Sequence, residues 1–210
     1  MSRSSDSPAV PARLTDRKRL AILDAAMAEF RAHGFDGTSM DRVAAAAGAS
    51  KRTVYNHFPS KDALFVEIVR HLWQRGISEV SLAYSPARPL REQLVELLLQ
   101  KLRMLDDAAF VDLSRVAIAE AMRSPEHARD IIARLGSKEE GTTVWIRAAL
   151  ADGRLRPLQP EFASQQLQSL VKGFAFWPQI ALGQAPLSAQ QKAQVAESTA
   201  DLFLSHYASG

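Results

Sequence analysis

The residues best suited to chemistry lie in a seven-residue stretch that begins at Lys51. Its polar members are Lys51, Arg52, Thr53, Tyr55, Asn56 and His57. At about 100° per residue in an α-helix, Arg52, Thr53 and Asn56 fall on the side opposite Val54 and Phe58. Such a face can donate hydrogen bonds to phosphate oxygens and to the edges of bases. The alternative interpretation is an ordinary solvated helix face.

Two short helices are needed to position this face. Thr38 predicts the cap of a first helix, with Asp41 in its first turn, where the helix dipole favours an acid. Gly48 predicts the end of that helix, because glycine enters the left-handed conformation at little steric cost. Ser50 predicts the cap of a second helix that runs to Phe58. Two short helices joined by a glycine turn are typical of a helix-turn-helix, whose second helix enters the major groove of DNA.

Small and apolar residues in the same stretch support this interpretation. Ala44 is small enough to let the two helices approach, and Val54 is placed to pack the second helix against the first. Because Ala44, Gly48 and Val54 occur together at the required offsets, the sequence favours a DNA-binding helix over a solvated face.

The stretch from Thr38 to Leu64, with the preceding helix and Gly34, resembles the DNA-binding domain of TetR/AcrR-type transcriptional regulators, particularly in GASKRTVYNHFPSKDAL, residues 48–64. The combination of Tyr55, His57, Phe58 and Lys61 carries the resemblance. It implies an all-α homodimer that represses transcription until a small ligand binds a larger C-terminal domain. It also implies that Lys61 binds a phosphate.

Base-reading and phosphate-binding roles can be assigned separately within this surface. Arg52 is predicted to make a two-pronged contact to guanine. Supporting contacts to the bases are predicted for Lys51, Thr53 and Asn56. Tyr55, His57 and Lys61 are predicted to fix the helix on the DNA backbone. The full set of predicted DNA-contacting residues is Thr38, Ser39, Ser50, Lys51, Arg52, Thr53, Tyr55, Asn56, His57 and Lys61.

Composition and charge agree with a DNA-binding protein. The 210 residues are 47% apolar and 23% charged, enough for one or two packed domains. Residues 1–61 carry ten Lys or Arg against six Asp or Glu, a balance of +4, whereas residues 62–210 carry sixteen against seventeen, a balance of −1. The absence of cysteine and of a membrane-length apolar run favours a cytoplasmic location.

The sequence predicts about nine helices and no strand. Residues 1–13 form a predicted disordered tail, residues 14–61 a three-helix DNA-binding domain, and residues 62–210 a helical effector-binding and dimerisation domain. The first long helix is expected over residues 15–33, with Arg17, Lys18 and Arg19 in its first turn. A helix dipole disfavours cations there, so this cluster indicates either an external anion or a solvated patch.

A fourth helix is expected from Lys61 towards Tyr84, joining the two domains. Pro89 begins a fifth helix, residues 109–123 form the next, and Ser124 begins a seventh. Two last helices are expected near residues 161–182 and 188–207, the second opened by a capping box at Ser188 and Gln191. Pro178 predicts a kink or an early stop, since proline removes a helix hydrogen bond.

The last two helices carry apolar stripes. In the family that the sequence resembles, these helices pack against their copies in a second subunit, and the alternative is that they face only their own core. Because a major-groove reader normally uses paired half-sites, we expect a homodimer. The candidate interface residues are Leu167, Leu170, Phe174, Val195, Leu202 and Phe203.

A pocket for an unknown apolar or aromatic effector is expected in the larger domain. The candidate lining residues are Trp73, Met104, Phe110, Met122, Trp145, Phe174 and Trp177. The alternative is that these residues form ordinary core. A structural DNA-binding protein without ligand control is therefore the second functional hypothesis.

Catalytic and cofactor signals are weak. The glycine spacing of residues 136–143 approaches that of a phosphate-binding loop, but Thr142 stands where the lysine is required and no strand precedes it. The five histidines show no ligand-like spacing, so no metal or cofactor is expected. An enzyme is the third hypothesis, and the sequence disfavours it.

Overall fold

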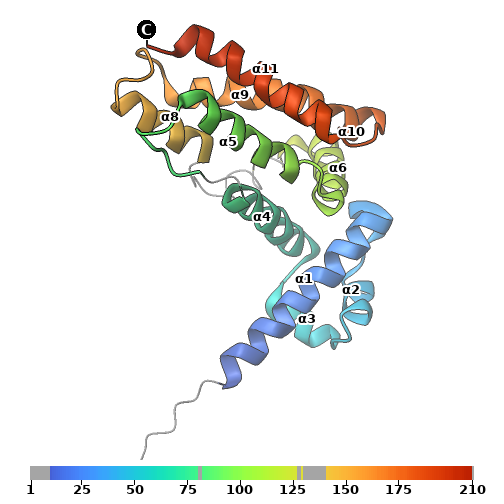
Figure 1. Ribbon diagram of the computed structural model, residues 1–210. Helices are drawn as coiled ribbons and strands as arrows, with labels where there is room; N and C mark the ends of the chain where they lie inside the picture. Colours follow the sequence, from blue (N-terminus) through green and yellow to red (C-terminus); the bar gives the residue numbers. More distant parts are fainter. Residues whose placement is uncertain (1–9, 80–81, 127–128, 130–140, 210) are drawn as a thin grey trace, which may run out of the picture. The chain divides into compact units, whose positions relative to one another are not determined.

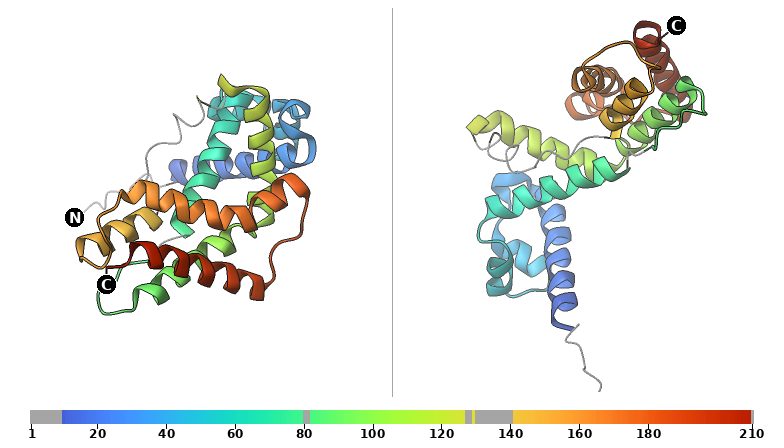
Figure 2. Two further views of the ribbon diagram at one scale, coloured as in Figure 1. Left: turned by 90° about the horizontal axis from the view of Figure 1, so that it is seen from above. Right: turned by 90° about the vertical axis from the view of Figure 1, so that its left-hand side faces the viewer.

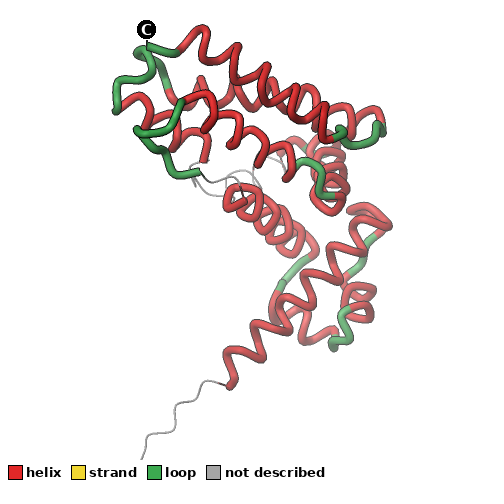
Figure 3. The backbone as a smooth tube through the Cα atoms, in the orientation of Figure 1, coloured by secondary structure: helices red, strands yellow, loops and turns green. Residues whose placement is uncertain are grey.

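A computed structural model describes residues 10–79, 82–126, 129 and 141–209, with side chains outside 10–14 and 72–79. All regular secondary structure in these ranges is helical, as the sequence predicts, and an isolated bridge joins Leu155 to Ala208 (Figure 3). Two compact units are present. Unit 1 takes residues 1–70 and 116–134, and unit 2 takes residues 71–115 and 135–210.

Unit 1 contains α1 (Val10–Gly37), α2 (Met40–Ala46), α3 (Lys51–His57) and the first half of α4 (Lys61–Glu79) (Figure 1). Its core is built on three aromatic rings. Phe30 is fully buried, and the centroid of the Phe65 ring lies 5.2 Å from that of Phe30 and 5.0 Å from that of Phe35. This cluster holds the end of α1 against α4, and so sets the frame on which α2 and α3 pack.

The first helix differs from the expected one at both ends. It begins at Val10, so Arg17 and Arg19 do not lie in its first turn. It also includes a kink at Gly34, whose φ of 68° and ψ of −176° are not helical. Glycine adopts this conformation at little cost, which explains why the chain turns here before α2.

Unit 2 contains α5 (Leu90–Met104), the first half of α6 (Ala108–Arg123), α8 (Gly141–Ala151), α9 (Pro160–Ala175), α10 (Trp177–Leu182) and α11 (Ala189–Tyr207). Helices α5, α9 and α11 run side by side in each view (Figure 2). Leu97, Trp145 and Leu167 are fully buried in this unit. Burial of such side chains is the main favourable contribution to its folding.

The break between α9 and α10 confirms the expected effect of Pro178. A single helix was expected near residues 161–182, but α9 ends at Ala175 and α10 begins at Trp177. Proline is accepted in the first turn of α10, where no intrahelical donor is required. The capping box of α11 is also confirmed, with the side chains of Ser188 and Gln191 each bonded to the other's backbone N–H.

Two expected helices differ from the structure or fall outside it. The fourth was expected to reach Tyr84, yet α4 ends at Glu79 and Tyr84 lies in a non-helical segment. Most of the seventh, including Gly136, lies outside the described residues.

The boundary between the two units lies within α4, after Arg70, whereas the sequence placed the domain boundary at Lys61. No helix in the described ranges is long and apolar enough to cross a membrane.

Candidate DNA-binding surface

The turn between α2 and α3 has the geometry of a helix-turn-helix. The Oγ of Ser39 accepts a hydrogen bond from the Arg42 backbone N–H at 3.3 Å, so Ser39 and not Thr38 caps α2. Gly48 has a φ of 59° and makes the turn in the left-handed region. Ser50 then caps α3 by accepting from the Thr53 backbone N–H at 3.1 Å, as predicted.

One side of α3 packs inward and the other faces solvent. Val54 is fully buried, and Phe58, the residue after the helix, is 2% exposed. Arg52 and Asn56 are exposed on the opposite side, and Tyr55 is 48% exposed. The buried side fixes the rotation of α3 about its own axis, because turning it would expose Val54 to water. The polar side is thereby presented for contact.

The cations at this surface differ in their partners. The Nζ of Lys51 lies 2.5 Å from the Oδ2 of Asp41, and the Nε of Arg42 lies 2.9 Å from the Oε2 of Glu29. Arg52 has no hydrogen-bond or ion-pair partner among the residues that the structure describes. Its guanidinium is therefore ready for an external acceptor.

Two residues predicted to touch DNA are held within unit 1. Thr38 is 3% exposed, and its hydroxyl donates to the Gly34 carbonyl at 2.8 Å. Lys61 is half-buried, and its ammonium donates to the Phe35 carbonyl at 2.8 Å while lying 4.4 Å from the centroid of the Phe35 ring. Lys61 thus binds the end of α1 beyond the kink at Gly34, a role that sequence reasoning missed.

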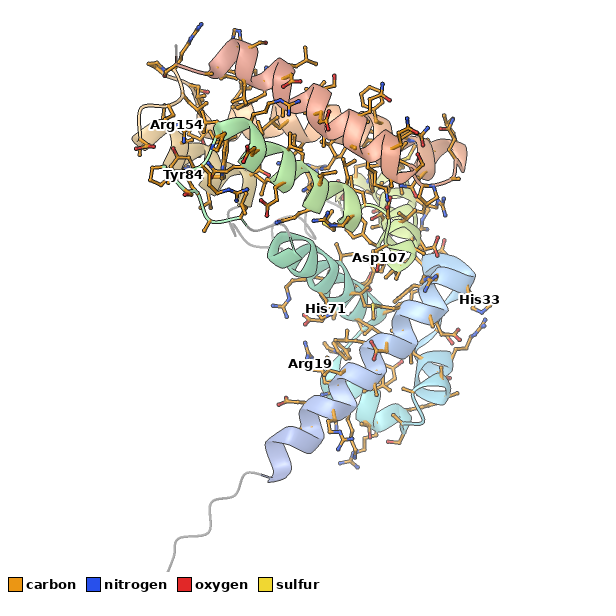
Figure 4. The ribbon with its side chains drawn as sticks, in the orientation of Figure 1. Arg19, His33, His71, Tyr84, Asp107 and Arg154 are labelled. Carbon is orange, nitrogen blue, oxygen red and sulfur yellow. The ribbon has the colours of Figure 1, made fainter. Side chains whose placement is uncertain are left out.

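Arg19 ties α1 to the rest of unit 1. Its guanidinium lies 4.6 Å from the centroid of the Phe58 ring and 2.7 Å from the Oε1 of Glu67, and Figure 4 shows it projecting from α1. Burial raises the pKa of Glu67, but hydrogen bonds and charges from Arg70 and Arg19 outweigh it, so the pKa falls below its usual 4.5. Arg19 therefore has a structural role, whereas Arg17 and Lys18 stay exposed.

The predicted pocket residues differ in burial and are divided between the two units. Trp145 is fully buried in unit 2, where its indole N–H donates to Gln93 at 3.4 Å. Met104 is buried, and the Phe110 ring packs 6.2 Å from that of Phe176. Met122 is 79% exposed and belongs to unit 1. The side chain of Trp73 lies outside the described residues, and Phe174 and Trp177 are exposed.

Polar residues around the buried Gln93 order the neighbourhood of Trp145, which sequence reasoning missed. The amide of Gln93 donates to the carbonyls of Ser85 and Arg88 at 2.9 and 3.0 Å. Tyr84 donates to Asp152 at 2.5 Å, and Figure 4 shows Tyr84 beside Arg154. Burial, followed by the hydrogen bond to Asp152, raises the pKa of Tyr84. No group of acids and histidines in the described part of the chain could hold a metal ion.

The predicted dimer residues differ in their exposure. Leu167 and Phe203 are buried in the core of unit 2, at 0% and 4% exposure, because α9, α11 and α5 pack together there. Val195 is half-buried. The exposed large apolar residues of α9, α10 and α11, hereafter the apolar face, are Phe162, Leu170, Phe174, Trp177, Leu182 and Leu202. Phe162 was missed, although it continues the helical spacing of Leu170 and Phe174.

Comparison with known proteins identifies both parts of the chain. Residues 22–68 match the N-terminal domain described as bacterial regulatory proteins of the tetR family, and residues 92–209 match the C-terminal domain of AefR-like transcriptional repressors. The regulator RutR of Escherichia coli is 26% identical over 172 residues, covering 80% of this chain and 79% of its own.

Solved structures agree over most of the chain. A TetR family regulator from Pseudomonas syringae is 47% identical, with a TM-score of 0.79 over 93% of this chain and 98% of its own. The flavonoid-responsive regulator FrrA is 29% identical, with a TM-score of 0.75 over 92% of this chain and 98% of its own. The resemblance read from residues 48–64 is thus confirmed, and these proteins are regulators, not enzymes. The chain belongs to the TetR family of helix-turn-helix transcriptional regulators.

Proposed function

We propose that this transcriptional regulator is a homodimeric repressor that leaves its operator when a small apolar or aromatic molecule binds unit 2. The observation that carries the proposal is the arrangement of α3. Arg52 and Asn56 are exposed directly opposite the buried Val54, on a helix whose start is capped by Ser50. An arginine presented in this way matches the two acceptors that guanine offers in the major groove.

The proposed DNA contacts follow from exposure. Arg52 and Asn56 read bases, with Lys51 and Thr53 beside them. Ser39 and Ser50 contact the DNA backbone from the N-termini of α2 and α3, whose free N–H groups favour anions. Phosphate contacts are also proposed for Tyr55, His57 and the half-buried Lys61. Thr38 is excluded from direct side-chain contact by its burial.

The apolar face supports the dimer. Phe162, Phe174, Trp177 and Leu202 are each at least half exposed in the single chain. Exposed apolar residues on the neighbouring helices α9, α10 and α11 are typical of an interaction site. A second copy of the chain would bury them, and two-fold pairing would supply two recognition helices for two half-sites.

Ligand control is supported by similarity and by the make-up of unit 2. FrrA, which is similar over 92% of this chain, is named for its response to flavonoids. Met104, Phe110 and Trp145 are the remaining candidate contacts in unit 2. A planar aromatic molecule is therefore the first class of effector to test.

The experiment has two stages. DNA fragments retained by the purified protein are sequenced to obtain the operator, and operator affinity is then measured with and without a panel of flavonoids and other aromatic compounds. An effector should weaken operator binding by about 1 to 3 kcal/mol, the range usual for allosteric coupling. Retention of fragments without a shared sequence would refute operator recognition. Saturable ligand binding that never alters DNA affinity would favour the structural DNA-binding alternative.

A further inference from the structure

Asp41 and Lys51 form an ion pair across the turn between α2 and α3. The Lys51 Nζ lies 2.5 Å from the Asp41 Oδ2, and the two side chains are 66% and 57% exposed. We propose that Asp41 is a positioning residue that sets DNA specificity, because it holds the Lys51 ammonium away from phosphates of non-specific DNA. The inference rests on the proposed function, in which the α2–α3 surface binds DNA.

Helix dipoles favour this pairing. Lys51 is the first residue of α3, where the partial positive charge of the helix N-terminus disfavours a cation. Asp41 lies in the first turn of α2, where the same partial charge stabilises a carboxylate. The carboxylate therefore offsets a charge that α3 alone would leave in an unfavourable position.

Pairing makes Lys51 a weaker phosphate ligand than its exposure suggests. A phosphate can bind the ammonium only by displacing or sharing the carboxylate of Asp41. Arg52, next in sequence, has no such competitor among the described residues. Because phosphate contacts supply essentially all non-specific binding, the pair lowers that binding more than it lowers base recognition by Arg52.

The pair also orients Lys51 for the operator. A lysine ammonium has three donors on a flexible stem, and one of them points to Asp41. The other two remain available at a fixed position beside the recognition face. Part of the conformational entropy of the Lys51 side chain is thus already lost before DNA binds. This lowers the entropic cost of a contact between Lys51 and an operator base.

Asp41→Asn in the full chain tests the proposal. Affinities for operator and for a scrambled duplex of equal length are measured across a sodium chloride series. Affinity for the scrambled duplex should rise about three- to fivefold, the upper range for an exposed ion pair. Its salt slope should steepen by about 0.9, the value for one phosphate contact. Operator affinity should rise less, so discrimination falls.

Three controls separate this role from a structural one. Asp41→Glu keeps the carboxylate and should restore discrimination, and Asp24→Asn, at an exposed site on α1, changes the net charge equally and should leave the salt slope unchanged. In a Lys51→Ala background, Asp41→Asn should no longer change the slope. Thermal melting verifies that each variant is folded.

The results distinguish failure of the inference from failure of the proposed function. If the wild-type protein does not prefer operator to scrambled DNA, the proposed function fails. If it does prefer operator, an equal rise in both affinities, or no rise, overturns the role of Asp41. An effect of Asp41→Asn that persists without Lys51 also overturns it, since Asp41 would then act by direct repulsion of phosphate.

Discussion

Arg52 is the side chain on which base recognition depends most. Arg52→Ala should weaken operator binding by about 1 to 3 kcal/mol and relax preference at one or two base pairs per half-site. Affinities for operator and single-base variants of it check this. Arg17→Ala, which removes an exposed cation from α1, is the matched control and should leave base preference unchanged. Equal losses on operator and scrambled DNA for Arg52→Ala would mean that α3 is rotated in the groove.

Lys61 is expected to serve both folding and DNA binding. Lys61→Ala removes the hydrogen bond to the Phe35 carbonyl and the contact with the Phe35 ring, so unfolding free energy should fall by about 1 kcal/mol. Operator and scrambled DNA should both bind more weakly, with a salt slope smaller by about 0.9. Denaturation and a salt series measure the two effects. A stability loss with an unchanged slope would show that Lys61 only anchors the end of α1.

At the scale of elements, Glu67 links α4 to α1 through Arg19. Because the pKa of Glu67 is lowered in the folded state, this link stabilises the fold above about pH 4.5. The stabilisation is lost as the pH falls through the folded-state pKa. Glu67→Gln should cost about 1 kcal/mol near pH 7 and make stability less sensitive to acid. Urea denaturation near pH 7 and pH 3.5 tests this, with Asp24→Asn as control. Equal losses at both pH values would contradict an ionic link.

At the scale of the molecule, dimerisation should depend on the apolar face and not on the buried residues Leu167 and Phe203. Phe174→Arg combined with Leu202→Arg should give folded monomers that lose most operator affinity, because two half-sites then bind independently. Light scattering and operator affinity measure both effects. Val144→Arg, at an exposed apolar residue of α8, should remain dimeric. A dimeric double variant would show that the interface lies elsewhere.

Phe203 shows why burial within the single chain could not be predicted from an apolar stripe alone. Phe203 and Leu202 are neighbours in one apolar stripe, yet their exposures are 4% and 58%. Helical periodicity indicates that a stripe is buried. It does not indicate whether the stripe packs in the core of its own chain or against a second copy. A charge at Phe203 would disrupt the core of unit 2, and loss of the dimer in such a variant would not report on the interface.

The sequence by itself determined the local features of the helix-turn-helix and of α11. Gly48, Ser50 and the pair Ser188 and Gln191 act on backbone groups within a few residues, so their effects do not depend on the rest of the chain. Val54 likewise predicted which side of α3 is buried, because a two-turn helix has only one apolar side. Pro178 predicted the break between α9 and α10 for the same local reason.

Only the tertiary structure decided which cations are engaged and which apolar residues face outward. Lys61 bonds to a carbonyl 26 residues away, and Arg19 pairs with Glu67 on another helix. Such contacts depend on how α1 and α4 pack, which no pattern within either helix states. The exposure of Phe162, Phe174 and Leu202 likewise follows from the packing of α9 and α11 against α5, because only three-dimensional packing determines which part of an apolar stripe the core covers.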